Sequence, residues 1–166
     1  MNINRKSAEK IIGISLVIWS FIVLYYNIIT FKYIIEITNL SWEEISLFKI
    51  TKNYHFQFII AILNLASGIL LILSKRIGWM GSVVMSIVNG LGFIIFLWPL
   101  NTDESIHNEM TNSELLMFSS IIILFFIFGL VLLNKVFRKK YQPTKNTWVI
   151  ITLIIIILCA DKILIN

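Results

Sequence analysis

Long uninterrupted runs of apolar residues, separated by short polar segments, dominate the pattern along the chain. A helix of roughly 20 residues crosses a hydrocarbon core about 30 Å thick, and five runs are about this long. They lie at about 11–31, 56–73, 77–100, 115–134 and 148–165. Apolar residues follow one another in these runs without the alternation with polar residues that a membrane β-strand needs. We therefore predict an all-α, polytopic integral membrane protein in which residues 1–166 form one five-helix transmembrane domain.

The composition supports a membrane protein and excludes several other classes. Hydrophobic residues make up 58% of the chain and charged residues only 14%, with a mean hydropathy of +0.87. Soluble domains contain about 25% charged residues, and disordered chains contain few apolar ones. A single cysteine excludes a disulfide framework or a thiolate metal cage. We expect a multi-pass protein of a bacterial-type inner or plasma membrane.

The distribution of charge predicts the orientation. If the N-terminus lies inside, the inner segments are 1–10, 74–76 and 135–147, which hold ten of the 14 basic residues and one acid, Glu9. Cytoplasmic loops are enriched in Lys and Arg, so the N-terminus is expected inside and the C-terminus outside. The residues expected to contact lipid head groups and fix the topology are Lys75, Arg76, Lys135, Arg138, Lys139, Lys140 and Lys145.

A cytoplasmic partner that docks on 135–147 is the alternative interpretation of this basic run. Nucleic acid is not expected as a partner, because the positive charge is divided among short loops at a membrane surface. Two tryptophans next to the inner segments, Trp79 and Trp148, are expected in an interfacial aromatic belt. In the first outer loop, the pattern at 41–50 predicts a short amphipathic helix on the membrane surface, with a plain loop as the alternative.

Small residues recur every four positions in the third run, which predicts close helix packing. The second run offers a similar surface, and the short 74–76 connection makes the two runs an antiparallel pair. Asn64 and Asn89 are then expected at similar depth, where their side chains can form a hydrogen bond; a polar ligand or ion path is the alternative. The predicted helix-packing residues are Asn64, Gly68, Gly78, Ser82, Ser86, Asn89 and Gly90.

The first four runs carry no charge near their centres, which argues against a proton-coupled transporter or an ion pump. Asp161 and Lys162 are the only charges inside a run. They stand close to the chain end, so both side chains are expected to extend to the outer interface. Pairing of Asp161 with another helix is the alternative.

Both histidines are assigned to the outer loops, near acidic residues. Histidine and carboxylate side chains together can bind a divalent metal or act as an acid–base pair. The candidates are His55, Asp103, Glu104 and His107, although ordinary solvated loop residues are the simpler interpretation. The chain shows no phosphate-binding loop, zinc-protease or haem motif, so neither a cofactor nor a metal is expected.

Three functions remain open at this point. The leading hypothesis is a non-enzymatic accessory, immunity or sensor-like protein that acts through helix–helix and lipid contacts. Its partner would be another membrane protein or a second copy, bound through the small-residue pattern of 77–100. The second is a small channel or carrier for a neutral or lipid-like solute, with Asn27, Asn64, Ser86 and Asn89 along its path. The third is an outward-facing membrane enzyme that uses the histidine and carboxylate candidates.

Overall fold

The computed structural model describes residues 4–38, 47–97 and 112–165. All regular structure in these residues is helical, and the elements are α1 (Arg5–Thr38), α2 (Leu47–Ile72), α3 (Arg76–Leu97), α5 (Asn112–Leu132), α6 (Lys135–Tyr141) and α7 (Lys145–Ile165). Five of these helices, all except α6, are long and apolar enough to cross a membrane. The all-helical fold with five spans that the sequence predicts is therefore confirmed.

The helices extend beyond the apolar runs that predicted them. α1 has 34 residues, so it is about 51 Å long and exceeds a hydrocarbon core by roughly 20 Å. A helix satisfies its own backbone polar groups, so it can continue into the polar region where hydrophobicity no longer marks it. α2 likewise begins at Leu47, so 47–50 of the predicted surface helix belong to α2. Residues 41–46 of that prediction lie outside the described residues.

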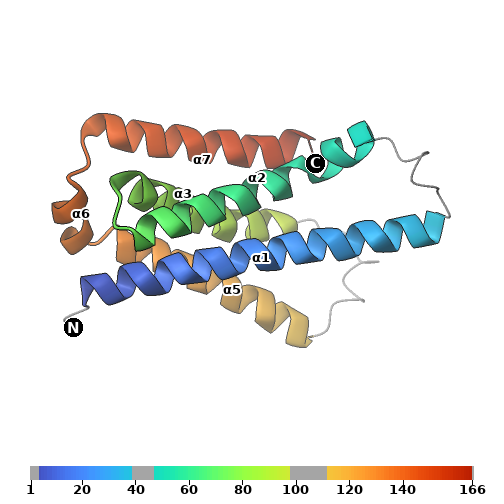
Figure 1. Ribbon diagram of the computed structural model, residues 1–166, viewed down its shortest axis with the longest axis horizontal. Helices are drawn as coiled ribbons and strands as arrows, with labels where there is room; N and C mark the ends of the chain where they lie inside the picture. The colour runs from blue at the N-terminus through green and yellow to red at the C-terminus, as the bar shows by residue number, and fades with distance from the viewer. Residues whose placement is uncertain (1–3, 39–46, 98–111, 166) are drawn as a thin grey trace.

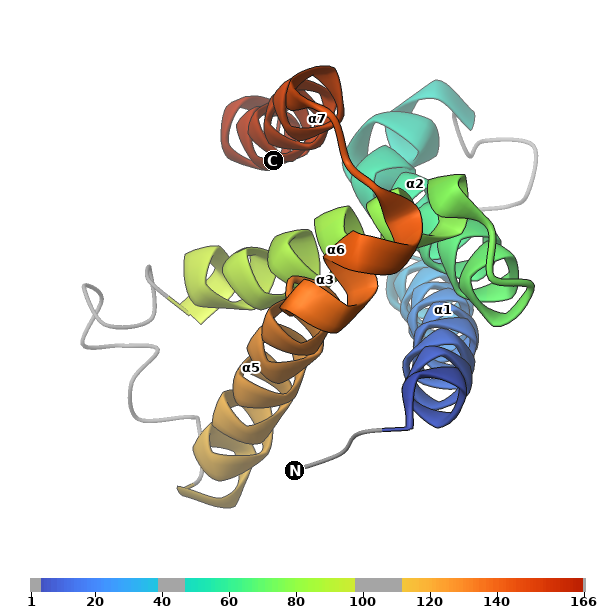
Figure 2. The ribbon, with the colours of Figure 1, turned by 90° about the vertical axis from the view of Figure 1, so that its left-hand side faces the viewer.

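α3 is the central helix of the bundle. It packs against α2, α5 and α7, and more than half of its membrane-crossing part is buried. α1 lies alongside α2, and α7 lies on the opposite side of α2 and α3 from α1 and α5 (Figures 1 and 2). In the described residues, α1 thus contacts α2, α2 contacts α3, and α3 contacts both α5 and α7.

One end of the bundle collects three of its connections. α1 begins there, α2 and α3 are joined there, and α6 links α5 to α7 across it; we call it the α6 end (Figures 1 and 2). The α2–α3 turn closes with the Ser74 and Lys75 N–H groups donating to the carbonyls of Leu71 and Leu70. Ser74 has a positive φ of 56° in this turn. The antiparallel α2–α3 pair agrees with the prediction from the short connection.

α6 is a short helix that the sequence analysis treated as part of a loop. The side chain of Asn134 caps its start by accepting from the Val136 N–H, at 3.2 Å. Gln142 ends it in the left-handed conformation, with φ of 44°, and Pro143 follows. A capping asparagine and a following proline are ordinary helix boundaries. Seven residues between them give too little periodicity to distinguish a helix from a basic loop.

Close backbone contact between helices depends on glycines at two crossings. A Cβ atom on Gly68 would lie 2.6 Å from the Gly13 carbonyl oxygen, and one on Gly13 would lie 2.8 Å from the Gly68 oxygen, so α1 and α2 touch there. A Cβ on Gly78 would collide with the backbone of Leu70 and Leu71, where α3 crosses α2. Gly68 was expected on the α3-facing surface of the second span, and its contact with α1 corrects that expectation.

The small-residue pattern of α3 does not face one neighbour. Gly78 meets α2, whereas the nearest atoms to a Cβ on Gly90 belong to the ring of Phe126 in α5. Each step of four residues turns about 40° around a straight helix, so three steps turn about 120°. Gly78, Ser82, Ser86 and Gly90 are all buried, and the helices that cover them belong to the same chain.

Candidate functional site

Two asparagines form a reciprocal pair between α2 and α3. The Asn89 amide donates to the Asn64 carbonyl oxygen at 2.9 Å, and the Asn64 amide donates to the Asn89 oxygen at 3.4 Å. The hydrogen bond predicted from their equal depth is therefore present. Asn64 is fully buried, and Asn89 is 6% exposed. Each carboxamide keeps one further N–H for another partner.

Two serines of α3, Ser82 and Ser86, are also buried. Ser82 donates to the backbone carbonyl of Ser67 at 3.2 Å, which adds a further α2–α3 hydrogen bond. Ser86 lies between α3 and α5 near Gly129, and its buried hydroxyl has no hydrogen-bond partner in the described residues. Ser86 is therefore in a helix–helix contact, and it does not line the cavity described next.

A cavity of about 590 Å³ lies beside Asn89, among α1, α2, α3 and α5. Its volume falls in the range of small-molecule sites. Five aromatic side chains contribute to the wall, together with aliphatic residues and four neutral polar ones. The lining residues are Trp19, Ile22, Val23, Tyr26, Asn27, Thr30, Phe56, Gln57, Ile60, Val88, Asn89, Gly92, Phe93, Met117, Phe118, Ile121 and Lys162.

The cavity extends from the surface to the interior of the bundle. On its outer side, Tyr26 of α1 is 65% exposed and Met117 of α5 is 51% exposed. On its inner side, Val88, Ile60 and Phe56 are buried. The exposed walls belong to α1 and α5, two helices that mainly contact α2 and α3 rather than each other. The exposed part of the cavity wall therefore lies on two membrane-crossing helices, α1 and α5.

Asn27 and Gly92 show how the chain leaves this space open. The Asn27 amide donates to the Val23 carbonyl of its own helix at 2.9 Å, so the side chain is held against α1. A Cβ atom on Gly92 would have no neighbouring atom within 4 Å. The cavity wall at Gly92 is thus backbone, and a larger side chain at this position would occupy the cavity.

A contact between His55 and Asp161 joins α2 and α7 near one margin of the cavity. His55 Nε2 lies 3.0 Å from Asp161 Oδ2 and 3.1 Å from Oδ1. His55 was expected in a loop, but it lies inside α2. Asp161 was expected to extend to the outer interface; the pairing with another helix, which was the alternative, is what the structure shows. The next residue, Lys162, places Nζ 5.5 Å from the ring centroid of Phe56 and lines the cavity.

The other candidates for the metal or acid–base site cannot be placed. Asp103, Glu104 and His107 lie outside the described residues. Within the described residues, no group of three or more His, Cys, Asp or Glu side chains could hold a metal ion. His55 contacts the Asp161 carboxylate across the α2–α7 contact instead.

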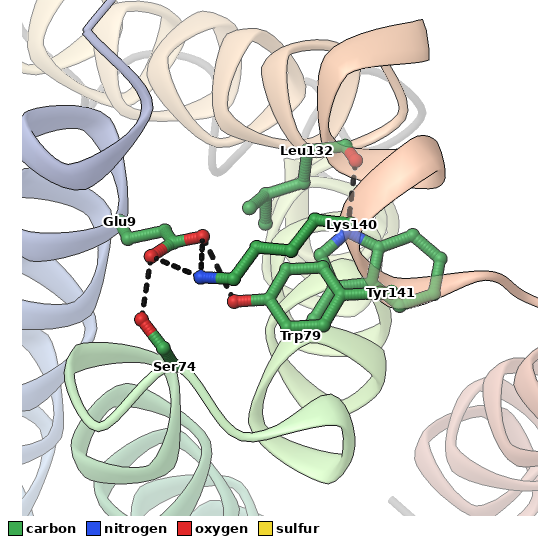
Figure 3. Close-up of polar contacts among 6 residues, drawn as sticks. All are labelled: Glu9, Ser74, Trp79, Leu132, Lys140 and Tyr141. Carbon is green, nitrogen blue, oxygen red and sulfur yellow. Dashed lines mark hydrogen bonds and ion pairs between the residues drawn. The ribbon is translucent and has the colours of Figure 1, made fainter.

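A second polar cluster, at the α6 end, was not predicted. The Glu9 carboxylate of α1 is 2% exposed and accepts hydrogen bonds from three residues in two other segments (Figure 3). Lys140 Nζ lies 2.6 Å from Oε1 and 2.8 Å from Oε2, Tyr141 donates to Oε1 at 2.9 Å, and Ser74 donates to Oε2 at 2.7 Å. Glu9 thereby connects α1 to the α2–α3 turn and to α6.

Tyr141 also connects this cluster to α3. Its ring stacks on Trp79, with centroids 5.6 Å apart and planes at 16° (Figure 3). Burial of the Tyr141 hydroxyl and its hydrogen bond to the Glu9 carboxylate raise the pKa of the phenol well above its usual value. The phenol therefore stays protonated and remains a hydrogen-bond donor to Glu9 throughout the physiological pH range.

Trp79 is a buried residue of this cluster, although it was expected at the membrane interface. It is fully buried and donates from Nε1 to the Leu132 carbonyl of α5 at 2.9 Å. Trp148 of α7 packs edge-on against it, with centroids 6.0 Å apart. This carbonyl is in the last turn of α5, where backbone acceptors have no partner inside the helix. Trp79 therefore acts as a cap for α5.

Two of the basic residues assigned to lipid head groups make internal contacts. Lys140 pairs with Glu9 and is only 20% exposed, and Arg76 donates to Thr147 Oγ1 at 2.8 Å. Their charges thus hold α6 and the start of α7 against the bundle. The other five are exposed at the α6 end: Lys75, Lys135, Arg138, Lys139 and Lys145.

The fold and these sites define a class of protein, a multi-pass helical membrane protein with a cavity between its spans. Comparison with known proteins found no matching family model, no matching curated protein and no matching solved structure.

Proposed function

We propose that this protein binds a small lipid-like molecule in the cavity among α1, α2, α3 and α5, as a carrier or binding protein within the bilayer. The observation that carries the proposal is a cavity of about 590 Å³ with aromatic and aliphatic walls and a few polar groups. Sites for small molecules usually have this composition. The exposed wall residues on α1 and α5, two membrane-crossing helices, support entry from the lipid rather than from water.

The proposal is preferred over the accessory role because of where the small residues lie. Gly78, Ser82, Ser86 and Gly90 are buried under α2 and α5. A partner helix would have to displace one of these helices to reach them. Helix contacts on the outer, apolar faces of α5 and α7 would need a different surface, for which the described residues show no pattern of small side chains.

We further propose that the bundle lies in a plasma or inner membrane with the α6 end in the cytoplasm. The three basic segments of the sequence occur together at this end (Figure 1). This arrangement supports the orientation that the positive-inside rule predicts.

Filling the cavity tests the binding proposal. In Gly92→Phe, the new ring enters open space, so binding is expected to be lost while the helices stay packed. The probe is the methyl ester of a fatty acid brominated in the middle of its chain, added to purified protein in phosphatidylcholine nanodiscs. Bromine quenches tryptophan fluorescence on contact, and Trp19 lines the cavity. The variant Trp19→Phe identifies the part of the signal that comes from this residue.

The matched control is Ile94→Phe, which adds a ring on the same helix at an exposed position. Saturable quenching of Trp19 is expected in the wild type and in Ile94→Phe, but not in Gly92→Phe. Equal quenching in all three proteins, or only the non-saturable quenching of a lipid-exposed tryptophan, would show that the cavity binds no lipid-like molecule.

A further inference from the structure

The cavity combines an apolar interior with a single cation. Among its described lining residues, Lys162 is the one charged side chain, and no acidic residue occurs. The carboxylate of the adjacent Asp161 contacts His55 on α2, at 3.0 Å. Lys162 Nζ lies over the ring of Phe56. Lys162 is therefore positioned to bind an anion at the margin of an otherwise neutral cavity.

The position of this cation along the bundle matters as much as its charge. Lys162 is three residues from the end of α7, so it lies near the membrane boundary opposite the α6 end. Trp19, Val88 and Ile121 lie further towards the middle of their helices, and the cavity joins them to Lys162. A molecule that fits has an anionic group at the boundary and an apolar portion in the bundle. A lipid in the surrounding leaflet has the same orientation, with its head group at the boundary and its chain inside the membrane.

We propose that the ligand is a single-chain amphiphile with an anionic head group, a carboxylate or a phosphate, and that Lys162 binds this head group. The inference rests on the proposed binding function and specifies its ligand class. The Lys162 ammonium would pair with the head group, and the aromatic walls would enclose the chain. Gln57 and Thr30 also line the cavity and supply neutral polar groups. A fatty acid and a lysophospholipid with a terminal phosphate are both members of this class.

The test compares a charged and a neutral probe with the same chain. The brominated fatty acid is titrated into the wild-type protein in phosphatidylcholine nanodiscs, at an alkaline pH at which its carboxylic acid is ionised. Its methyl ester is titrated in parallel. A charge-assisted contact at a partly buried site predicts that the acid binds about tenfold more tightly than the ester. In Lys162→Gln, the acid should lose this advantage, while the affinity for the ester should stay within about twofold of the wild type.

The matched control is Lys32→Gln, which removes an exposed cation of α1 that does not line the cavity. It should keep the preference for the acid, which excludes a general effect of surface charge on partitioning into the nanodisc. Inorganic phosphate is added as a third probe. It should not displace the brominated acid, because it has no chain to occupy the apolar part of the cavity.

The outcomes separate the two proposals. Equal affinity for acid and ester in the wild type, or an unchanged preference in Lys162→Gln, would overturn the head-group assignment and leave lipid binding intact. Displacement of the acid by inorganic phosphate would overturn the assignment of the ligand as an amphiphile and would indicate a simple anion site. Absence of saturable Trp19 quenching by either probe would overturn the binding function itself.

Discussion

At the scale of single residues, the buried polar side chains of the described residues form hydrogen-bonded clusters, with Ser86 as an exception. Glu9 accepts from Lys140, Tyr141 and Ser74, whereas the Ser86 hydroxyl has no partner among the described residues. Removing one partner from a buried ionic cluster costs more than the cluster contributes, because the remaining groups lose their hydrogen bonds. Among the residues of this cluster, substitution of Glu9 should therefore reduce the stability of the α6 end most.

We predict that Glu9→Ala lowers the free energy of unfolding by about 2–3 kcal/mol, because three donors lose their shared acceptor. Lys140 is partly exposed and can turn towards solvent, which keeps the loss below that of a fully enclosed ion pair. The measurement is equilibrium unfolding in mixed micelles with a denaturing detergent. The control is Glu36→Ala, an exposed acid on the same helix, which should change stability by less than about 0.5 kcal/mol. Similar losses in both variants would mean that the cluster contributes nothing specific.

At the scale of helices, the sequence could predict features that depend on one continuous segment, but not contacts between segments far apart in the chain. Length and hydrophobicity are properties of a continuous segment, so the five spans could be read directly. The Asn64–Asn89 pair could be predicted because the short α2–α3 turn fixes the depth of both residues. The Glu9–Lys140 pair joins residues 131 positions apart, and no local pattern indicates it. The cavity is the space that packing leaves, so it could not be predicted from any one helix.

Glycine substitutions at two positions of α3 provide a matched test of the helix contacts. Gly78→Ala should destabilise the bundle by about 1–3 kcal/mol, because its Cβ would force the α3 and α2 backbones apart. Gly92→Ala should be neutral or stabilising by up to about 1 kcal/mol, because its Cβ meets only open space and alanine favours the helix. Both are measured by unfolding in mixed micelles. Equal effects at the two positions would contradict the close α2–α3 crossing at Gly78.

At the scale of the whole molecule, the two ends of the bundle differ in chemistry. The α6 end is held together by the Glu9 cluster, by Trp79 and by the Arg76–Thr147 hydrogen bond, and nine of its described basic residues are exposed. Near the opposite end, the cavity separates α1 from α5. A bundle fixed at one end and open between two helices in the other half is suited to admit a molecule from the bilayer without loss of its fold. In the proposed orientation, the proposed ligand would enter from the outer leaflet.

This orientation can be measured with single cysteines. In a Cys159→Ala background, Lys139→Cys reports on the α6 end, and Lys32→Cys reports on the far part of α1; both positions are exposed. Because basic segments are retained in the cytoplasm, a maleimide that does not cross membranes should label Lys32→Cys in intact spheroplasts. Lys139→Cys should react only after the membrane is permeabilised. The reverse pattern would place the α6 end outside, and the ligand would then have to enter from the inner leaflet. Labelling of both positions in intact spheroplasts would show a mixed orientation, which the concentration of basic residues at one end argues against.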